Sequence, residues 1–248
     1  MTFCLGMRTH EGLVGIADTL ITSGNELTLG KKLTCINHGN GCVFLLTSGL
    51  RSVRDKTITY FEEHLREIDK PYNRMFKVVN AFARKIRQVA KEDKAFLKES
   101  GLSFNIHCLI GGQMSDDHEH ALYLIYPEGN WVEIAEETPY QIIGAPAYGK
   151  PVLDRTFTNR DSLEFAVKVG CLAFDSTRIS ASDVDFPVDL VLYHKNTFKM
   201  IEHRYEQEEL SDISTWWDNA LRQAIKELPD EWMKRVLAKL NPGRQVQT

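Results

Sequence analysis

The fold is decided by residues 2–18, TFCLGMRTHEGLVGIAD, at the start of the sequence. Apolar and polar residues alternate on both sides of a His10-Glu11-Gly12 turn, which is typical of two antiparallel strands joined by a short connection. The sequence therefore predicts a β-hairpin that begins at its second residue. Hairpin geometry allows Asp18, at the end of the second arm, to lie near Thr2, at the start of the first.

Strand and helix signals alternate along the rest of the chain. A looser connection at 19–30 leads to two further antiparallel strands, at 31–36 and 42–49. Apolar residues then recur at helical spacing in two segments that are joined around Pro71. Over the rest of the chain we expect helices at 52–65, 72–98, 147–156 and 162–177, and strands within 104–114, 120–129, 130–144, 187–196 and 198–206.

This order of elements predicts an α+β protein. Strands, a helix pair, strands, a second helix pair and final strands fit a four-layer αββα sandwich, with two antiparallel sheets between helical layers. We expect a single domain over 1–248, with a core at about 2–205 and a helical extension at about 206–248. The extension holds amphipathic segments at 213–228 and after Pro229.

Composition argues against several functional classes. A net charge of -4 over 248 residues is too small to suggest a nucleic-acid surface. Five cysteines without a CxxC pair are a poor disulfide framework and fit a reducing cytoplasm. No signal peptide or membrane span is expected, since the sequence lacks apolar runs of about 18 residues. The histidines show metal-ligand spacing only at His118-x-His120, in an acidic turn, so neither a metal nor a cofactor is expected.

Thr2 is a candidate nucleophile. A threonine hydroxyl reacts weakly unless a base lies within hydrogen-bond reach, and a free α-amino group with a pKa of about 7.7–8.0 can be that base. Removal of Met1, which usually occurs before small residues, would put hydroxyl and amine on one residue. Thr2 alone identifies nothing, because threonine follows the initiator methionine in many proteins.

Asp18 and Lys32 are candidate partners of Thr2. Strict alternation turns one residue of the Lys31-Lys32 pair inward, and an inward lysine needs a partner such as Asp18. There Lys32 would orient the threonine hydroxyl or accept its proton. Two plainer interpretations stay open, a solvated strand edge for the two lysines and an ordinary turn residue for Asp18.

Together these residues resemble the proteasome β-subunit family. Thr2, Asp18 and the GKKL strand start at 30–33 stand in the order and at the spacing of that family. The TSG segment at 47–49 is similar to the one whose glycine N–H forms the oxyanion hole, which implies Gly49. The FDSTRIS segment at 174–180 is similar to the helix-ending motif that supports the threonine, which implies Asp175.

Within this superfamily the chain resembles the bacterial ancestral β-subunit type, often called Anbu. The MT start without a propeptide, the YGKPVLDR run at 148–155, and FDST followed by FPVDL carry this resemblance. The chain departs from many β-subunits at 144–147, where GAPA replaces a segment with a supporting serine. A longer loop after Asp175 leaves open whether Ser180 or Ser182 matches the second serine of the family.

The resemblance implies hydrolysis of amide bonds in a peptide or unfolded protein, in the cytoplasm of a bacterium. It also implies a homo-oligomer, as a ring or spiral, and leaves an ATP-dependent unfoldase open. A shell protein that assembles without cleaving and a small-molecule amidase are the alternatives. The residues expected to line the substrate pocket are Leu20, Lys31, Leu33, Thr47, Ser48 and Arg51.

Overall fold

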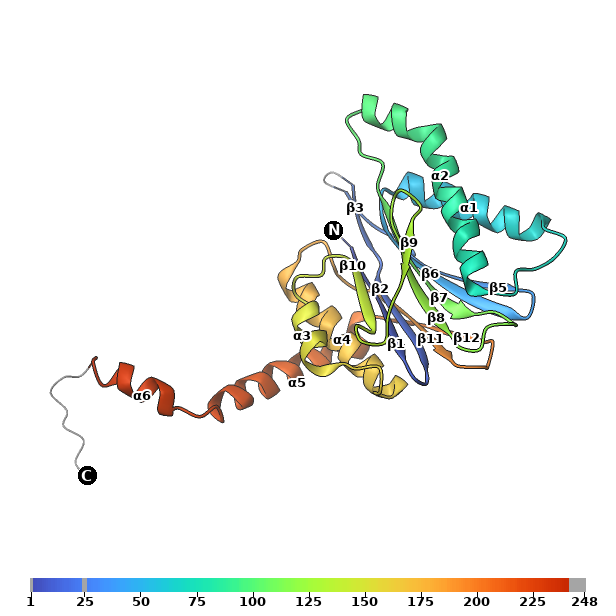
Figure 1. The fold of residues 1–248 in the computed structure, drawn as a ribbon. Helices are drawn as coiled ribbons and strands as arrows, with labels where there is room; N and C mark the ends of the chain where they lie inside the picture. The colour runs from blue at the N-terminus through green and yellow to red at the C-terminus, as the bar shows by residue number, and fades with distance from the viewer. Residues whose placement is uncertain (1, 24–25, 241–248) are drawn as a thin grey trace. The chain divides into compact units, whose positions relative to one another are not determined.

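The computed structural model describes residues 2–23 and 26–240 of the chain. By their contacts the residues form two compact units, Met1–Glu209 and Leu210–Thr248. The larger unit contains both large sheets and helices α1 to α4 (Figure 1).

The first sheet is built around the N-terminal hairpin. Its strand order is β10-β1-β2-β11-β12, and every neighbouring pair is antiparallel. All residues of β1 and β2 are buried, because this sheet is covered on both faces. The strands are β1 (Phe3–Thr9), β2 (Gly12–Asp18), β10 (Tyr140–Gly144), β11 (Val188–His194) and β12 (Met200–Tyr205).

The second sheet has the strand order β5-β6-β7-β8-β9 and is also antiparallel throughout. It faces the first sheet across a core in which Phe44, Leu109 and Leu122 are completely buried. The strands are β5 (Leu33–His38), β6 (Gly41–Gly49), β7 (Ile106–Gln113), β8 (Ala121–Ile125) and β9 (Trp131–Glu133).

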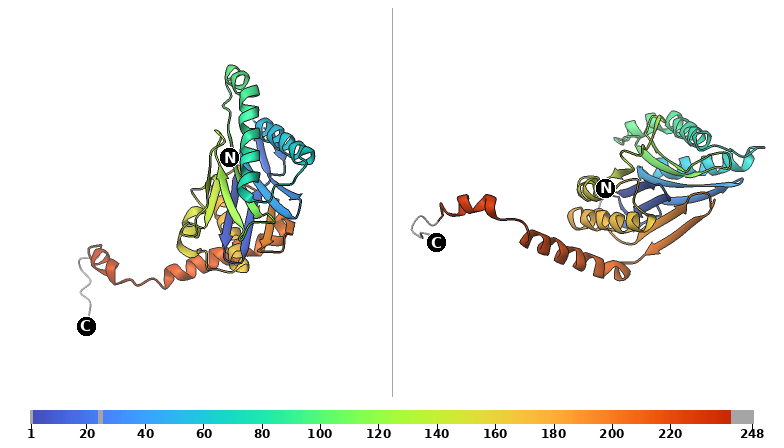
Figure 2. Two further views of the ribbon diagram at one scale, coloured as in Figure 1. Left: turned by 45° about the vertical axis from the view of Figure 1, so that its right-hand side comes forward. Right: turned by 60° about the horizontal axis from the view of Figure 1, so that its bottom comes forward.

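Two pairs of helices cover the outer faces of the sheets, as the views in Figures 1 and 2 show. Helices α1 (Arg51–Glu67) and α2 (Met75–Glu99) pack on the second sheet. The ring centroids of Phe61 on α1 and Phe82 on α2 lie 5.1 Å apart. Helices α3 (Lys150–Thr156) and α4 (Leu163–Ser180) cover the first sheet. The predicted four-layer αββα sandwich is therefore confirmed.

Two stretches differ from the sequence prediction. The connection at 19–30 forms a short hairpin of β3 (Leu20–Ser23) and β4 (Glu26–Leu29). Its strands were missed because Leu27 and Leu29 are exposed, so alternation marks no buried face. The strand signal at 130–144 divides between two sheets, since β9 ends before a turn that contains Pro139 and β10 joins β1.

The C-terminal unit contains most of α5 (Gln207–Lys226) and all of α6 (Glu231–Leu237). No residue of either helix is buried, and Trp216 and Trp232 are 61% and 68% exposed. The rings of Trp216 and Trp217 are stacked, with their centroids 6.3 Å apart. Among the helices of the described residues, none is both long and apolar enough to cross a membrane.

Candidate active site

Thr2 lies where the start of β1 meets the end of β10. The Ala145 amide donates a hydrogen bond of 2.7 Å to the Thr2 carbonyl oxygen. Gly144 has a φ of +97°, and a Cβ there would lie 1.9 Å from the same oxygen. Only glycine permits so close an approach of the two backbones. The segment at 144–147, which lacks the serine of many β-subunits, thus contacts Thr2 through its backbone.

Asp18 and Lys32 form a buried pair beside Thr2. Lys32 Nζ lies 2.8 Å from both carboxylate oxygens of Asp18, and the side chains are 3% and 0% exposed. The Phe3 amide also donates to Asp18 Oδ1, at 2.8 Å. The hairpin therefore brings Asp18 to the residue that follows Thr2, and the strand start brings Lys32 to Asp18.

The charge state of this pair follows from its hydrogen bonds. Burial raises the pKa of the Asp18 carboxyl above its ordinary 3.8, while the charge and hydrogen bonds of Lys32 oppose that rise. Lys32 Nζ also donates to the Leu20 carbonyl oxygen at 2.7 Å. Three acceptor atoms thus match the three protons of an ammonium group. The hydrogen bonds are therefore those of an ion pair between the Asp18 carboxylate and the Lys32 ammonium group.

The end of β6 forms the opposite wall of the site. Gly49 has a φ of +123°, and a Cβ there would lie 2.4 Å from the Asn105 carbonyl oxygen, so glycine is required. Thr47 is almost completely buried, and its amide and hydroxyl donate to the Lys32 carbonyl oxygen at 3.1 Å and 3.3 Å. These bonds fix the end of β6 against the segment that carries Lys32.

A cavity of about 320 Å³ opens between these elements. Thr2, Lys32 and Gly49, which the sequence analysis proposed as catalytic, all line it. Of the expected pocket residues, Leu20, Thr47, Ser48 and Arg51 line it as well. Asp18 lies beneath Lys32 and supports this wall from behind.

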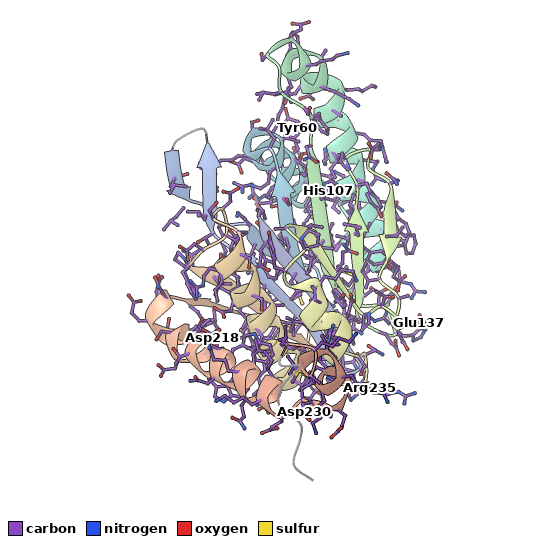
Figure 3. The ribbon with its side chains drawn as sticks, turned by 90° about the vertical axis from the view of Figure 1, so that its left-hand side faces the viewer. Tyr60, His107, Glu137, Asp218, Asp230 and Arg235 are labelled. Carbon is purple, nitrogen blue, oxygen red and sulfur yellow. The ribbon has the colours of Figure 1, made fainter. Side chains whose placement is uncertain are left out.

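A second hollow adjoins the first. It has a volume of about 430 Å³ and shares Ser48, Asn105 and Gly144 with the cavity at Thr2. It extends to His107, which pairs with Ser48 across β6 and β7 and is labelled in Figure 3. Burial lowers the pKa of His107, so the imidazole is neutral at pH 7. The open space at Thr2 therefore continues beyond the first cavity toward His107.

Other predicted residues lie elsewhere. Lys31 forms an ion pair with Glu202 at 2.6 Å, and Leu33 is buried in the core between the sheets. Asp175 is buried on α4, and Arg178 donates to it at 2.9 Å. Ser180 and Ser182 are exposed at and just beyond the end of α4, and Ser182 donates to Asp183. Their roles therefore stay predictions.

Sequence reasoning missed four residues of the cavity wall, Ile21, Arg54, Asn105 and Gly144. Ile21 belongs to the unexpected strand β3, and Asn105 reaches the site only through the pairing of β7 with β6. Arg54 carried a usable signal, because it follows Arg51 by three residues and the observed helix α1 begins at Arg51, one residue before the expected start. That spacing puts both side chains on one face.

The described residues contain no group of three or more His, Cys, Asp or Glu side chains arranged to hold a metal. All five cysteines are free. Cys4, on the strand that follows Thr2, is completely buried, and burial raises the pKa of its thiol well above the ordinary value. A thiol in that state is a poor nucleophile.

The family of the chain follows from comparison with known proteins. A model of the family described as proteasome subunit matches residues 2–185. No curated protein sequence matches the chain. Many solved structures are similar to it, among them three of the Anbu type.

A structure of an Anbu (Gly-1) mutant from Hyphomicrobium sp. strain MC1 is 31% identical, with a TM-score of 0.85 over 92% of this chain and 99% of that one. A helical assembly of the Anbu complex from Pseudomonas aeruginosa is 26% identical, with a TM-score of 0.86 over 92% and 97%. Anbu from Yersinia bercovieri, at 23% identity, has a TM-score of 0.84 over 92% and 97% and shows the shared fold. The chain therefore belongs to the proteasome subunit family and, within it, to the Anbu or ancestral β-subunit type.

Proposed function

We propose that the chain is a threonine-type N-terminal nucleophile hydrolase that cleaves peptide bonds, with Thr2 as its nucleophile after removal of Met1. The observation that carries the proposal is the cavity in which Thr2, Lys32 and Gly49 meet, backed by the buried Asp18–Lys32 pair. Membership of the family supports the same reaction class.

In this mechanism Thr2 Oγ attacks the carbonyl carbon of the substrate, and its proton passes to the α-amine of Thr2. The Gly49 amide donates a hydrogen bond to the carbonyl oxygen as that oxygen becomes negative. The carbon–nitrogen bond then breaks, the leaving amine takes the proton from the α-amine, and an ester remains on Thr2. Water hydrolyses the ester, which releases the acid and restores the threonine.

The sequence leaves either the α-amine of Thr2 or Lys32 as the base, and the hydrogen bonds of Lys32 favour the amine. Lys32 donates to three acceptor atoms, two on Asp18 and one on Leu20, and a protonated ammonium has no lone pair to receive a proton. Its positive charge instead disfavours protonation of a neighbouring amine and stabilises the developing oxyanion. Lys32 thus acts in our proposal through its charge.

The buried pair also weighs against a purely structural role. Burying two charges costs desolvation energy that their attraction barely repays, so a buried ion pair contributes little to stability in comparison with apolar packing. A shell protein that only assembled would gain little from such a pair beside Thr2. Hydrolysis explains why the site keeps it.

Peptide hydrolysis by Thr2 variants tests the proposal. Thr2→Ala removes the nucleophile and should lower kcat/KM on a fluorogenic peptide by about a hundredfold or more, whereas Thr2→Ser keeps a hydroxyl and should retain measurable turnover. Thr59→Ala, at an exposed site on α1, is the matched control and should behave as wild type. Wild-type activity in Thr2→Ala would refute the assignment.

We also propose that the protein self-associates in the bacterial cytoplasm. The helical assembly of its relative from Pseudomonas aeruginosa supports a homo-oligomer of ring or spiral type. The free cysteines support a reducing compartment. Analytical ultracentrifugation should show species much larger than 28.3 kDa, and a monomer at all concentrations would contradict self-association.

A further inference from the structure

The cavity at Thr2 has an unbalanced charge. Lys32, Arg51 and Arg54 line it, and no aspartate or glutamate is among its lining residues in the described part of the chain. Lys32 is neutralised from behind by Asp18. The two arginines therefore decide the charge that a substrate meets.

Arg51 and Arg54 share one carboxylate. Arg54 Nε donates to Asp55 Oδ1 at 2.8 Å, and Arg51 Nε donates to Asp55 Oδ2 at 3.3 Å. Two guanidinium groups against one carboxylate leave one positive charge at this wall. The Asp55 side chain is 52% exposed, so water can solvate it if a competing anion takes its place on the arginines.

Arg54 is the more constrained of the two arginines. Its side chain is 10% exposed, compared with 58% for Arg51, and it lines the cavity from the first turns of α1. The first turn of this helix contains no acidic residue, and Leu50 provides no side-chain cap. The positive end of the helix dipole therefore adds to the charge of the arginines.

Building on the proposed hydrolase function, we propose that this cavity selects an acidic side chain, aspartate or glutamate, on the substrate residue whose carbonyl group Thr2 attacks. That residue stays bonded to Thr2 as the ester, so its side chain occupies the cavity at Thr2 that Arg51 and Arg54 line. A carboxylate there pairs with Arg54 and Arg51 in a bidentate, charge-assisted manner and releases Asp55 to water. With a neutral substrate side chain in the cavity, Arg54 would keep only the exposed Asp55 carboxylate as its ion-pair partner.

Paired peptide substrates test this selectivity. Glutamate and glutamine have nearly the same shape and differ in charge, so two acetylated peptides that differ only in this residue before an aminocoumarin leaving group isolate the electrostatic contribution. We expect kcat/KM to be about tenfold or more higher for glutamate. A ratio at or below one would overturn the inference.

Two variants locate the effect. Arg54→Gln should bring the glutamate-to-glutamine ratio close to one, and Arg66→Gln, the same change at an exposed site of α1, should leave it unchanged. Asp55→Asn removes the competing carboxylate at an exposed position and should raise the ratio. It also serves as the test if Arg54→Gln does not fold. Ratios that stay at the wild-type value in Arg54→Gln or in Asp55→Asn would overturn the assignment to this wall.

The outcome separates this inference from the function on which it rests. Turnover of the glutamine peptide that requires Thr2, without a preference for glutamate, would leave the hydrolase intact and refute the acidic selectivity. Absence of turnover on both peptides, together with an unmodified Thr2 after treatment with a threonine-directed epoxyketone, would refute the hydrolase function itself.

Discussion

The two ends of the β1–β2 hairpin each bury a positive charge, but they do so in different ways. At the open end, Lys32 pairs with Asp18, and both side chains are almost completely inaccessible to water. At the turn end, the side chain of Arg8 is 10% exposed, yet its partners Glu119, Glu133 and Glu136 are 70%, 49% and 59% exposed. Only the open end confines both members of its ion pair to the interior.

This difference separates the charge that we propose to be functional, at Lys32, from an ordinary structural charge at Arg8. Water screens the carboxylates around Arg8 and can solvate them if the arginine is lost. Asp18 has no such alternative, so its ionised state depends on Lys32. The same strands thus carry an ordinary ion-pair network at one end and, beside Thr2, a pair that must stay intact.

Loss of Lys32 should have the largest effect on stability. Lys32→Met leaves an uncompensated buried carboxylate and should lower the free energy of unfolding by about 3–5 kcal/mol, as measured by urea denaturation. Lys31→Met, the same change one residue earlier at an exposed ion pair, should cost about 1 kcal/mol or less. Equal losses in the two variants would contradict the contrast between buried and exposed charge.

Loss of Arg8 should have an intermediate effect. Arg8→Met removes a hydrogen bond of 3.3 Å to the Ile134 carbonyl oxygen and three screened ion pairs, while the apolar stem is largely replaced. We expect a loss of about 1–2 kcal/mol in urea denaturation, together with normal activity. A loss as large as that of Lys32→Met would show that partner exposure does not separate the two ends.

The smallest predicted effect concerns His120, near Arg8. Its side chain is buried, and its Nε2 lies 2.8 Å from the Thr9 carbonyl oxygen. Burial lowers the pKa of His120 below its ordinary 6.5, so the folded state binds a proton less readily than the unfolded state. Stability from the neutral imidazole is therefore present above pH 6.5 and declines as the pH falls below it, by at most about 1.4 kcal/mol per pH unit.

The variant His120→Gln tests this pH dependence of stability. Urea denaturation at pH 7.5 and pH 5.5 should show a smaller difference from wild type at the lower pH, because only the wild type loses stability through His120. A difference that is constant or grows on acidification would contradict the burial of a neutral imidazole.

Sequence reasoning was most successful where a local pattern determines the structure. Alternation on both sides of Gly12 predicted the hairpin, and the inward residue of the Lys31-Lys32 pair is Lys32, next to Asp18. The resemblance to β-subunits added Gly49, which local periodicity alone does not single out. Secondary structure and the residues around Thr2 were therefore largely predictable.

The rest of the site depends on contacts between distant segments. Asn105 reaches the cavity because β7 pairs with β6, and Gly144 reaches Thr2 because β10 pairs with β1. Neither register is encoded within a single segment. In β4, Leu27, Thr28 and Leu29 are all exposed, so this strand lacks the apolar face that marks a buried strand. For the same reason the charge of the cavity wall, set by Arg51, Arg54 and Asp55, emerges only in the folded chain.

Mass spectrometry of the protein before and after treatment with a threonine-directed epoxyketone tests the central claim most directly. The ring adduct with this reagent requires a free amine and a hydroxyl on the same residue. We predict an adduct on Thr2 of a chain that has lost Met1, formed more slowly in Lys32→Met than in Arg8→Met. Complete retention of Met1 without an adduct would contradict the assignment of Thr2 as a nucleophile.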